Sequence, residues 1–395
     1  MKILILAWEF PPRIVGGIAR HVAELYPEMV QLGHEIHLIT IEFGEAPAQE
    51  VVEGVQVYRV PVPANEDFFA WVGQMNLSMG KKGGELIQKL GGFDLIHAHD
   101  WLVSDVAIAL KHLFKIPLIA TIHATEYGRC HGLHNETNFY INRKERELVH
   151  DAWRVIVCTE YMKVEVVTTL DCPADKIDIV HNGIRPHKKH KDPTFDYEQF
   201  REEFAHSEEK IVYYVGRIAP EKGIEVLLRA APKVINAFGA GVRFIVIGGG
   251  YTQHLKDLAE SIGIRESCQF TGFMPDEDLD KFQTIADCAV FPSLYEPFGI
   301  VVLESFAAKV PVVVSNAGGF LEVVQHKHTG VITAANDPDS LAWGILEVLQ
   351  HPDRAQTWVE NAYADLEKRF SWPNLARQTE QVYQQVLEER QRVDW

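Results

Sequence analysis

Apolar residues in this 395-residue chain occur in short unbroken runs, separated by longer segments that have one apolar face. The runs that predict strands in the first half are residues 2–8, 35–41, 55–60, 94–99, 117–123, 154–159 and 176–181. A second series follows at residues 210–215, 242–247, 269–272, 286–292, 311–315 and 330–333. Because these runs are continuously apolar, helices are expected to cover both faces of each sheet. The pattern predicts an α/β chain with parallel sheets.

Helix-length segments separate most of these strands, and the series is interrupted once, by a polar stretch at residues 185–206. A chain of this length is too long for one ordinary core, so two domains are expected. We place them at residues 1–190 and 191–373. Three further helices are predicted at residues 339–349, 354–370 and 374–392, with a break at Trp372-Pro373.

The composition is that of a globular protein, with 47% hydrophobic and 24% charged residues and a formal charge of −17. This charge disfavours binding to nucleic acid or to anionic membranes. The local exception is the basic stretch Arg185-Pro-His-Lys-Lys-His-Lys191, which is more simply interpreted as a solvated linker. No apolar run approaches the roughly 18 residues of a spanning helix. Five scattered cysteines fit reduced thiols, so a cytoplasmic protein is expected.

The segment Ser293-Leu-Tyr-Glu-Pro-Phe-Gly299 links a predicted strand to a predicted helix that starts at Ile300. Glu296 therefore lies at the carboxyl end of a strand, where open α/β sheets bind ligands. The amides around Phe298, Gly299 and Ile300 form a helix N-terminus, which suits an anion. Glu304 follows within that helix. The pattern suits a sugar nucleotide, although a loop glutamate and a solvated helix glutamate would look the same.

Three other loops that follow predicted strands carry glycines or cations. Gly16 and Gly17 join the first strand to a helix, either to let a ligand approach or simply to make a turn. Arg217 and Lys222 follow the strand at 210–215 and would neutralise a diphosphate, or belong to an ordinary basic loop. Gly249, in Gly248-Gly-Gly250, would let the backbone approach a nucleotide, although a flexible turn explains it equally well.

Histidines end two strands of the first half. His97-Ala-His-Asp-Trp101 offers two histidines, Asp100 and Trp101, and the next strand ends at His123. We interpret the alternation of His97 and His99 as one ring packed inward and one facing outward, in preference to a metal site. The Asp-x-Asp segments at residues 276–278 and 337–339 are interpreted as helix caps. No metal ligand is assigned.

The order of these segments resembles that of retaining glycosyltransferases of family 4, close to the glycogen and starch synthase branch. The resemblance extends over nearly the whole chain. The matching segments are Val15-Gly-Gly-Ile-Ala-Arg-His-Val22, His97-Ala-His-Asp-Trp101, Thr121-Ile-His123, His181-Asn-Gly-Ile184, Gly216-Arg217, Glu221-Lys-Gly223 and the pair Glu296 and Glu304. The family implies the GT-B fold, in which two Rossmann-like domains face each other across a cleft. It also implies that the last helix, residues 374–395, packs back on the first domain.

The resemblance implies a role for each matching residue. In the second domain, Arg217 and Lys222 would hold the donor diphosphate, Glu296 the transferred sugar and Glu304 the ribose, while the amides of Phe298, Gly299 and Ile300 would bind hexose and phosphate. In the first domain, Gly17 would face the donor diphosphate and the acceptor, with Gly16 beside it as a substrate-binding residue. Asp100 and Trp101 would lie on the acceptor side. His123 would meet the donor hexose, and Asn182 belongs to a matching substrate-binding segment. The chain departs from the sister family's Lys-x-Gly-Gly motif, because Arg13 lies one place further from the glycines.

The resemblance thus implies a metal-independent retaining glucosyltransferase without a cofactor. Its expected substrates are ADP- or UDP-glucose as donor and an α-1,4-glucan or maltose-like acceptor. One alternative is the same fold with another acceptor: a sugar phosphate, fructose or a lipid-linked sugar. The other alternative is a noncatalytic protein that binds sugar nucleotides or glucans.

Overall fold

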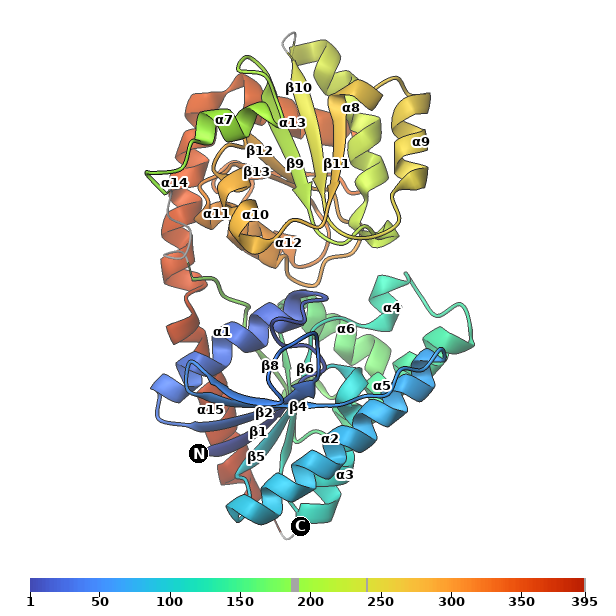
Figure 1. Cartoon of the computed structure of the whole chain (residues 1–395), viewed down its shortest axis with the longest axis vertical. Helices are drawn as coiled ribbons and strands as arrows, with labels where there is room; N and C mark the ends of the chain where they lie inside the picture. The colour runs from blue at the N-terminus through green and yellow to red at the C-terminus, as the bar shows by residue number, and fades with distance from the viewer. Residues whose placement is uncertain (186–191, 239–240, 394–395) are drawn as a thin grey trace. The chain divides into compact units, whose positions relative to one another are not determined.

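The computed structural model describes residues 1–185, 192–238 and 241–393, and the chain divides into two compact units. The first unit contains Met1–Gly183 and the C-terminal segment that starts at Trp372; the second contains Ile184–Ser371. The expected boundary at 190/191, and all of the basic stretch except Arg185, lie outside the described residues. In each unit helices cover both faces of a central sheet, as the apolar strands predict (Figure 1).

The sheet of the first unit has eight strands in the order β3-β4-β2-β1-β5-β6-β7-β8. Its strands are β1 (Lys2–Leu6), β2 (Glu35–Ile41), β3 (Gln49–Val52), β4 (Val55–Val60), β5 (Leu95–His99), β6 (Leu118–Ile122), β7 (Arg154–Val157) and β8 (Ile177–Ile179). Its helices are α1 (Gly17–Gln31), α2 (Phe68–Leu90), α3 (Ser104–Phe114), α4 (Glu126–Arg129), α5 (Glu136–Asp151), α6 (Glu160–Leu170) and α15 (Trp372–Arg390). The strand order changes direction between β1 and β5, so the loops after these strands lie beside each other.

The edge strand β3 is the one strand of the first sheet that the apolar pattern missed. It pairs antiparallel with β4 through the turn at Glu53 and Gly54, both of which have positive φ angles. Two positive φ angles are the requirement of a two-residue type I′ hairpin. Because β3 lies at the edge and alternates between exposed and half-buried positions, it carries no continuous apolar run.

Helix α15 completes the core of the first unit. Leu375, Tyr383 and Val386 are fully buried in the same cluster as Ile3 and Val22. Each such side chain stabilises the unit by about 1.5–3 kcal/mol relative to an exposed one. The expected break at Trp372-Pro373 was misplaced, because α14 ends at Arg369 and Trp372 begins α15. Proline is tolerated here because the first turn of a helix does not use its missing N–H.

The second unit has a six-stranded parallel sheet in the order β11-β10-β9-β12-β13-β14. Its strands are β9 (Lys210–Val215), β10 (Val242–Ile247), β11 (Cys268–Gly272), β12 (Cys288–Phe291), β13 (Val312–Ser315) and β14 (Val331–Thr333). Its helices are α7 (Tyr197–Glu202), α8 (Ile224–Phe238), α9 (Gln253–Ser261), α10 (Asp276–Gln283), α11 (Ile300–Ala307), α12 (Phe320–Val323), α13 (Pro338–Gln350) and α14 (Pro352–Arg369). This is the strand order of a doubly wound nucleotide-binding sheet, with its switch point between β9 and β12.

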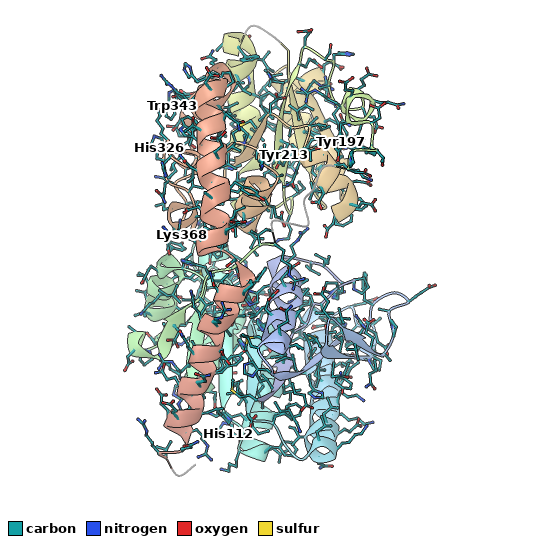
Figure 2. The ribbon with its side chains drawn as sticks, turned by 90° about the vertical axis from the view of Figure 1, so that its left-hand side faces the viewer. His112, Tyr197, Tyr213, His326, Trp343 and Lys368 are labelled. Carbon is teal, nitrogen blue, oxygen red and sulfur yellow. The ribbon has the colours of Figure 1, made fainter. Side chains whose placement is uncertain are left out.

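Two polar side chains of this unit hold helices in place through hydrogen bonds. Tyr213 of β9 is fully buried, and its hydroxyl lies 3.0 Å from Ser305 Oγ of α11 (Figure 2). This contact ties α11 to the central strand of the sheet. Asp337 caps α13 by accepting hydrogen bonds from the backbone N–H groups of Asp339 and Ser340, as predicted for this Asp-x-Asp segment.

Among the described residues, no helix is both long and apolar enough to span a bilayer.

Candidate active site

The loops after β9 and β12 meet at the switch point of the second sheet. Leu294 N–H donates a hydrogen bond of 2.7 Å to the carbonyl of Glu221, which joins the two loops directly. Gly223 lies at the contact with φ +65°, and a Cβ atom there would come within 2.0 Å of the carbonyl oxygen of Pro292. Only glycine fits this position, so the close approach of the two loops is built into the sequence.

The predicted cations lie on the first of these loops. Lys222 Nζ is 2.9 Å from Glu296 Oε2, and both side chains are largely buried. Arg217 pairs with Glu221 at 3.1 Å, but its side chain remains 53% exposed. Lys222 is therefore fixed by a partner on the neighbouring loop, whereas Arg217 is held within its own loop and extends into solvent.

The second loop presents Glu296 and the start of α11. Glu296 also accepts a hydrogen bond from Ser293 Oγ at 3.3 Å, and its carbonyl accepts one from Gly319 N–H. Gly299 precedes α11 with φ +99°, and a Cβ there would clash with the ring of Phe320 at 2.4 Å. Ile300 begins the helix, and Val302 N–H donates to the carbonyl of Gly299, so the N–H groups before Val302 are the ones placed to meet an anion.

Two further predicted residues of this unit have different surroundings. Glu304 lies on α11 and is 3% exposed, which excludes the alternative of a solvated helix glutamate. Gly249 has open space where a Cβ atom would be, and its carbonyl accepts a hydrogen bond from Ile218 N–H. The neighbouring Gly248 is the sterically required glycine, since a Cβ there would lie 1.8 Å from the carbonyl oxygen of Gly216.

In the first unit, the Gly-Gly turn is organised by a residue that the sequence analysis missed. Glu9 is 1% exposed and accepts hydrogen bonds from the backbone N–H groups of Val15 and Gly16, at 2.6 and 2.9 Å. Burial raises the pKa of Glu9, while these two hydrogen bonds lower it. Gly16 has an extended backbone and Gly17 begins α1. The turn therefore does not require glycine at position 16 for a left-handed conformation.

Asp100 and Trp101 face inward. Asp100 Oδ1 accepts a 2.8 Å hydrogen bond from the backbone N–H of His123, and φ of Asp100 is +60°. Burial raises the pKa of this carboxyl to about 6, although Arg129 and the bound N–H groups lower it. Trp101 is 4% exposed and its ring lies near those of Phe68 and Phe69. Both residues therefore shape the loop end, and Asp100 holds His123 through its backbone.

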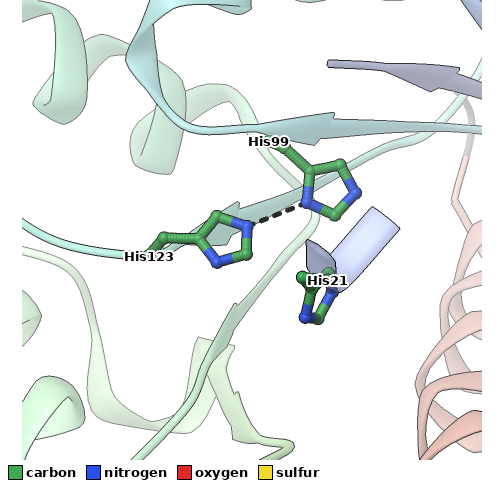
Figure 3. A group of neighbouring side chains, drawn as sticks. All are labelled: His21, His99 and His123. Carbon is green, nitrogen blue, oxygen red and sulfur yellow. Dashed lines mark hydrogen bonds between the residues drawn. The ribbon is translucent and has the colours of Figure 1, made fainter. Parts of the chain in front are cut away.

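The expectation that one of the two strand histidines faces outward was wrong. His97 and His99 are both fully buried, because β5 is a central strand with protein on both faces. His99 Nδ1 lies 3.0 Å from His123 Nε2, and His21 of α1 lies beside both rings (Figure 3). His123 itself is half-buried. Its pKa is lowered to about 3, first by burial and then by the charge of Arg129, so its ring is neutral at neutral pH.

Asn182 joins this histidine cluster. Its Oδ1 lies 2.7 Å from His21 Nδ1, so the predicted substrate residue already has a protein partner. His21 was not singled out from the sequence, although it belongs to the matching segment Val15–Val22. Its distance of 161 residues from Asn182 explains why no local pattern shows the contact.

Two family models match the chain. The model described as Glycosyltransferase Family 4 matches residues 15–188, and the model described as Glycosyl transferases group 1 matches residues 196–365. A protein of Methanocaldococcus jannaschii named an uncharacterized glycosyltransferase is 38% identical over 98% of this chain and 99% of its own length. A glycogen synthase of Mycobacterium tuberculosis is 33% identical over 97% of this chain and 94% of its own length.

Solved structures share the fold at lower identity. Sucrose-phosphate synthase from Thermosynechococcus elongatus superposes with a TM-score of 0.83 at 22% identity, covering 98% of this chain and 99% of its own. Anabaena HepE, solved in complex with UDP-glucose, gives a TM-score of 0.77 at 20% identity over the full length of both chains. With both sheets arranged as described, the chain belongs to the GT-B glycosyltransferases of family 4, near the branch of the glycogen and starch synthases.

Proposed function

We propose that this glycosyltransferase moves glucose from ADP-glucose or UDP-glucose to an α-1,4-glucan or a maltose-like acceptor, with retention of the anomeric configuration. The observation that carries the proposal is the pairing of Lys222 with Glu296 at the switch point, beside the first turn of α11. It brings a fixed cation, a buried carboxylate and helix N–H groups to one place. The cation and the helix N–H groups suit the nucleoside diphosphate, and the carboxylate suits the sugar attached to it.

The mechanism follows from where charge develops. As the bond between the anomeric carbon and the diphosphate oxygen breaks, negative charge builds on the leaving group and positive charge on the sugar. Lys222, Arg217 and the N–H groups of Gly299 and Ile300 stabilise the leaving oxygen, and each is worth most where water is excluded. This arrangement supplies positive charge to the diphosphate without a metal ion or other cofactor.

The two glutamates have separate tasks in this proposal. Glu296 contacts the transferred sugar, where its negative charge favours the positive character of the anomeric centre. Glu304 lies on α11, where a carboxylate suits paired hydrogen bonds to the two ribose hydroxyls. In the first unit, neutral His123 donates or accepts a hydrogen bond at the donor hexose, and Asp100 fixes its backbone.

The relatives support the choice of substrates. The Mycobacterium tuberculosis relative is named a glycogen synthase, and the Anabaena structure contains UDP-glucose. A phosphorylated small acceptor is the second candidate, because a Thermobispora bispora relative at 28% identity is named D-inositol 3-phosphate glycosyltransferase.

The test has two steps. Hydrolysis of ADP-glucose, UDP-glucose and control nucleotide sugars is measured first without acceptor; then maltooligosaccharides, sugar phosphates and inositol phosphate are compared. We expect elongation of maltooligosaccharides and an α-configured product by proton NMR. Transfer to phosphorylated acceptors alone would select the second candidate, and no turnover of any glucose nucleotide would refute the proposed donor.

A further inference from the structure

Three histidines of the first unit come together from segments that are distant in the sequence. His21 lies on α1, His99 ends β5 and His123 follows β6. One ring nitrogen of each lies within 4.8 Å of those of the other two (Figure 3). In a tetrahedral zinc site, with Zn–N bonds of about 2.0–2.1 Å, ligand nitrogens lie roughly 3.4 Å apart. In the cluster, His99 Nδ1 and His123 Nε2 are 3.0 Å apart and no separation exceeds 4.8 Å, so the three nitrogens lie near this distance.

His21 has a buried nitrogen without a hydrogen-bond partner in the described structure. The residue is 4% exposed, and its Nδ1–H donates to Asn182 Oδ1 at 2.7 Å. This tautomer leaves a lone pair on Nε2, the atom that has no partner. Leaving a buried polar atom unsatisfied costs about 1–3 kcal/mol. A ligand at Nε2 would recover that free energy.

The neighbouring His97 provides the contrast. It is equally buried, but both of its nitrogens are satisfied: Nδ1 lies 2.6 Å from Tyr383 Oη and Nε2 lies 2.7 Å from Thr121 Oγ1. His97 is therefore a structural histidine. His21 differs, because one of its two ring nitrogens, Nε2, has no hydrogen-bond partner in the described structure.

The hydrogen bonds behind His99 suit a metal ligand. His99 Nε2 lies 2.5 Å from the hydroxyl of Tyr26, which also hydrogen-bonds to Tyr383. When His99 Nε2–H donates to Tyr26, a lone pair is left on Nδ1, the nitrogen that faces His123. Metal-bound histidines are typically oriented in this way by a partner on the other ring nitrogen. His21 has such a partner in Asn182.

The chemistry of the three ligands selects the metal, since the cluster offers three imidazole nitrogens. Imidazole nitrogens favour zinc over magnesium or calcium, which prefer oxygen ligands.

We propose that His21, His99 and His123 bind one Zn²⁺ ion, with the fourth position open to water. We infer further that the ion inhibits transfer, because it occupies the His123 ring that would otherwise meet the donor hexose. The inhibitory half rests on the proposed function. The binding half does not.

Binding is tested on the full chain after dialysis against a chelator. Zn²⁺ is titrated in competition with a chromophoric chelator, and Co²⁺ provides the visible absorption of a tetrahedral site. We expect one equivalent of either ion. His21→Asn keeps a donor for Asn182 but removes Nε2, and His99→Gln keeps a donor for Tyr26 but removes Nδ1. Each variant should lose more affinity than the 10- to 100-fold that loss of an outer partner costs.

His254→Asn, on an exposed histidine of α9, is the matched control and should bind normally. Less than one equivalent bound by the wild type, or equal affinity in wild type, His21→Asn and His99→Gln, would overturn the site. If one variant fails to fold, the other decides.

Inhibition is measured as the activity with Zn²⁺ divided by each protein's own activity in chelator. We expect this ratio to fall at least tenfold in the wild type and to stay near one in His21→Asn. Stoichiometric binding with unchanged transfer would overturn the inhibitory half. A chain that binds zinc but transfers no glucose would instead refute the proposed function and leave the site standing.

Discussion

Lys222 Nζ and Glu296 Oε2 lie 2.9 Å apart, although 74 residues separate them in the chain. The pair joins the loops that follow β9 and β12, and the side chains are only 19% and 10% exposed. Removing one partner of a largely buried pair leaves the other charge without compensation. The pair therefore fixes Lys222 in position before the donor binds. In that position Lys222 would neutralise the diphosphate of the proposed donor.

We expect Lys222→Ala and Arg217→Ala each to lower kcat/KM by about 10²–10³, the usual effect of removing one donor that stabilises a leaving oxygen. Steady-state kinetics with the glucose nucleotide checks this. Arg229→Ala is the matched control, because Arg229 is also 53% exposed and also pairs with a glutamate four residues away. A folded Lys222→Ala, Arg217→Ala double variant with wild-type kinetics would exclude the diphosphate role.

Glu304→Gln and Glu296→Gln should differ in which kinetic parameter they change. Glu304→Gln is expected to raise KM for the donor with a smaller fall in kcat, because it weakens contact with the ribose. Glu296→Gln keeps an oxygen that can accept the hydrogen bond from Lys222 Nζ, so Lys222 stays in place and donor binding should change little. It is expected to lower kcat, because the lost negative charge matters most in the transition state. Calorimetry with the nucleoside diphosphate separates the two. Equal loss of diphosphate affinity in both variants would contradict this division.

The sequence predicted those parts of the molecule that depend on local pattern. The continuous apolar runs gave the central strands, and the polar loops at their carboxyl ends located Arg217 and Glu296 at one switch point. β3 was missed because an edge strand needs no apolar run. The roles of Glu9 and His21 were missed because they depend on contacts that form only in the folded unit. Glu9 binds the backbone N–H of Val15, and His21 is buried beside Asn182.

The error at His97 and His99 has a different cause. Residues two positions apart on a strand share one face, so the strand period already excludes one ring inward and one outward, and the two rings are stacked on each other. The period does not say whether that shared face is covered. Both rings are fully buried because α15, which starts more than 270 residues later, contributes Tyr383 to their surroundings. No pattern around residue 97 contains that information.

Transfer activity should survive a chelator. The Asp-x-Asp segments lie at helix starts. Asp337 caps α13, whereas residues 276–278 form the first turn of α10, whose N-cap is Pro275 and has no side-chain cap, so the capping role expected there was wrong. The charge of the leaving group is assigned to Arg217 and Lys222 instead. Initial rates before and after dialysis against EDTA check this, with added Mg²⁺ or Mn²⁺ as the comparison. Loss of activity that either ion restores would show that a metal takes part in the reaction.

Glu145 should make the stability of the first unit depend on pH. It lies on α5, is 1% exposed, and accepts a 2.8 Å hydrogen bond from Glu126 N–H through Oε1, whereas Oε2 has no hydrogen-bond partner in the described structure. Burial raises its pKa from 4.5 to about 8. The folded state therefore keeps a proton in this range that the unfolded state has released. The resulting stabilisation is complete below pH 4.5 and is lost as the pH rises towards 8.

Glu145→Gln mimics the protonated form and retains an oxygen for the hydrogen bond from Glu126. As the pH rises, the free energy of unfolding of the variant should increase relative to that of the wild type, by up to about 1.4 kcal/mol per pH unit. The gain should begin near pH 4.5 and level off above pH 8. Urea denaturation of both proteins across this range measures the difference. Glu147→Gln, on the same helix but with a side chain 42% exposed, is the control and should show no such slope. Parallel stability curves for wild type and Glu145→Gln would mean that Glu145 is already ionised in the folded protein.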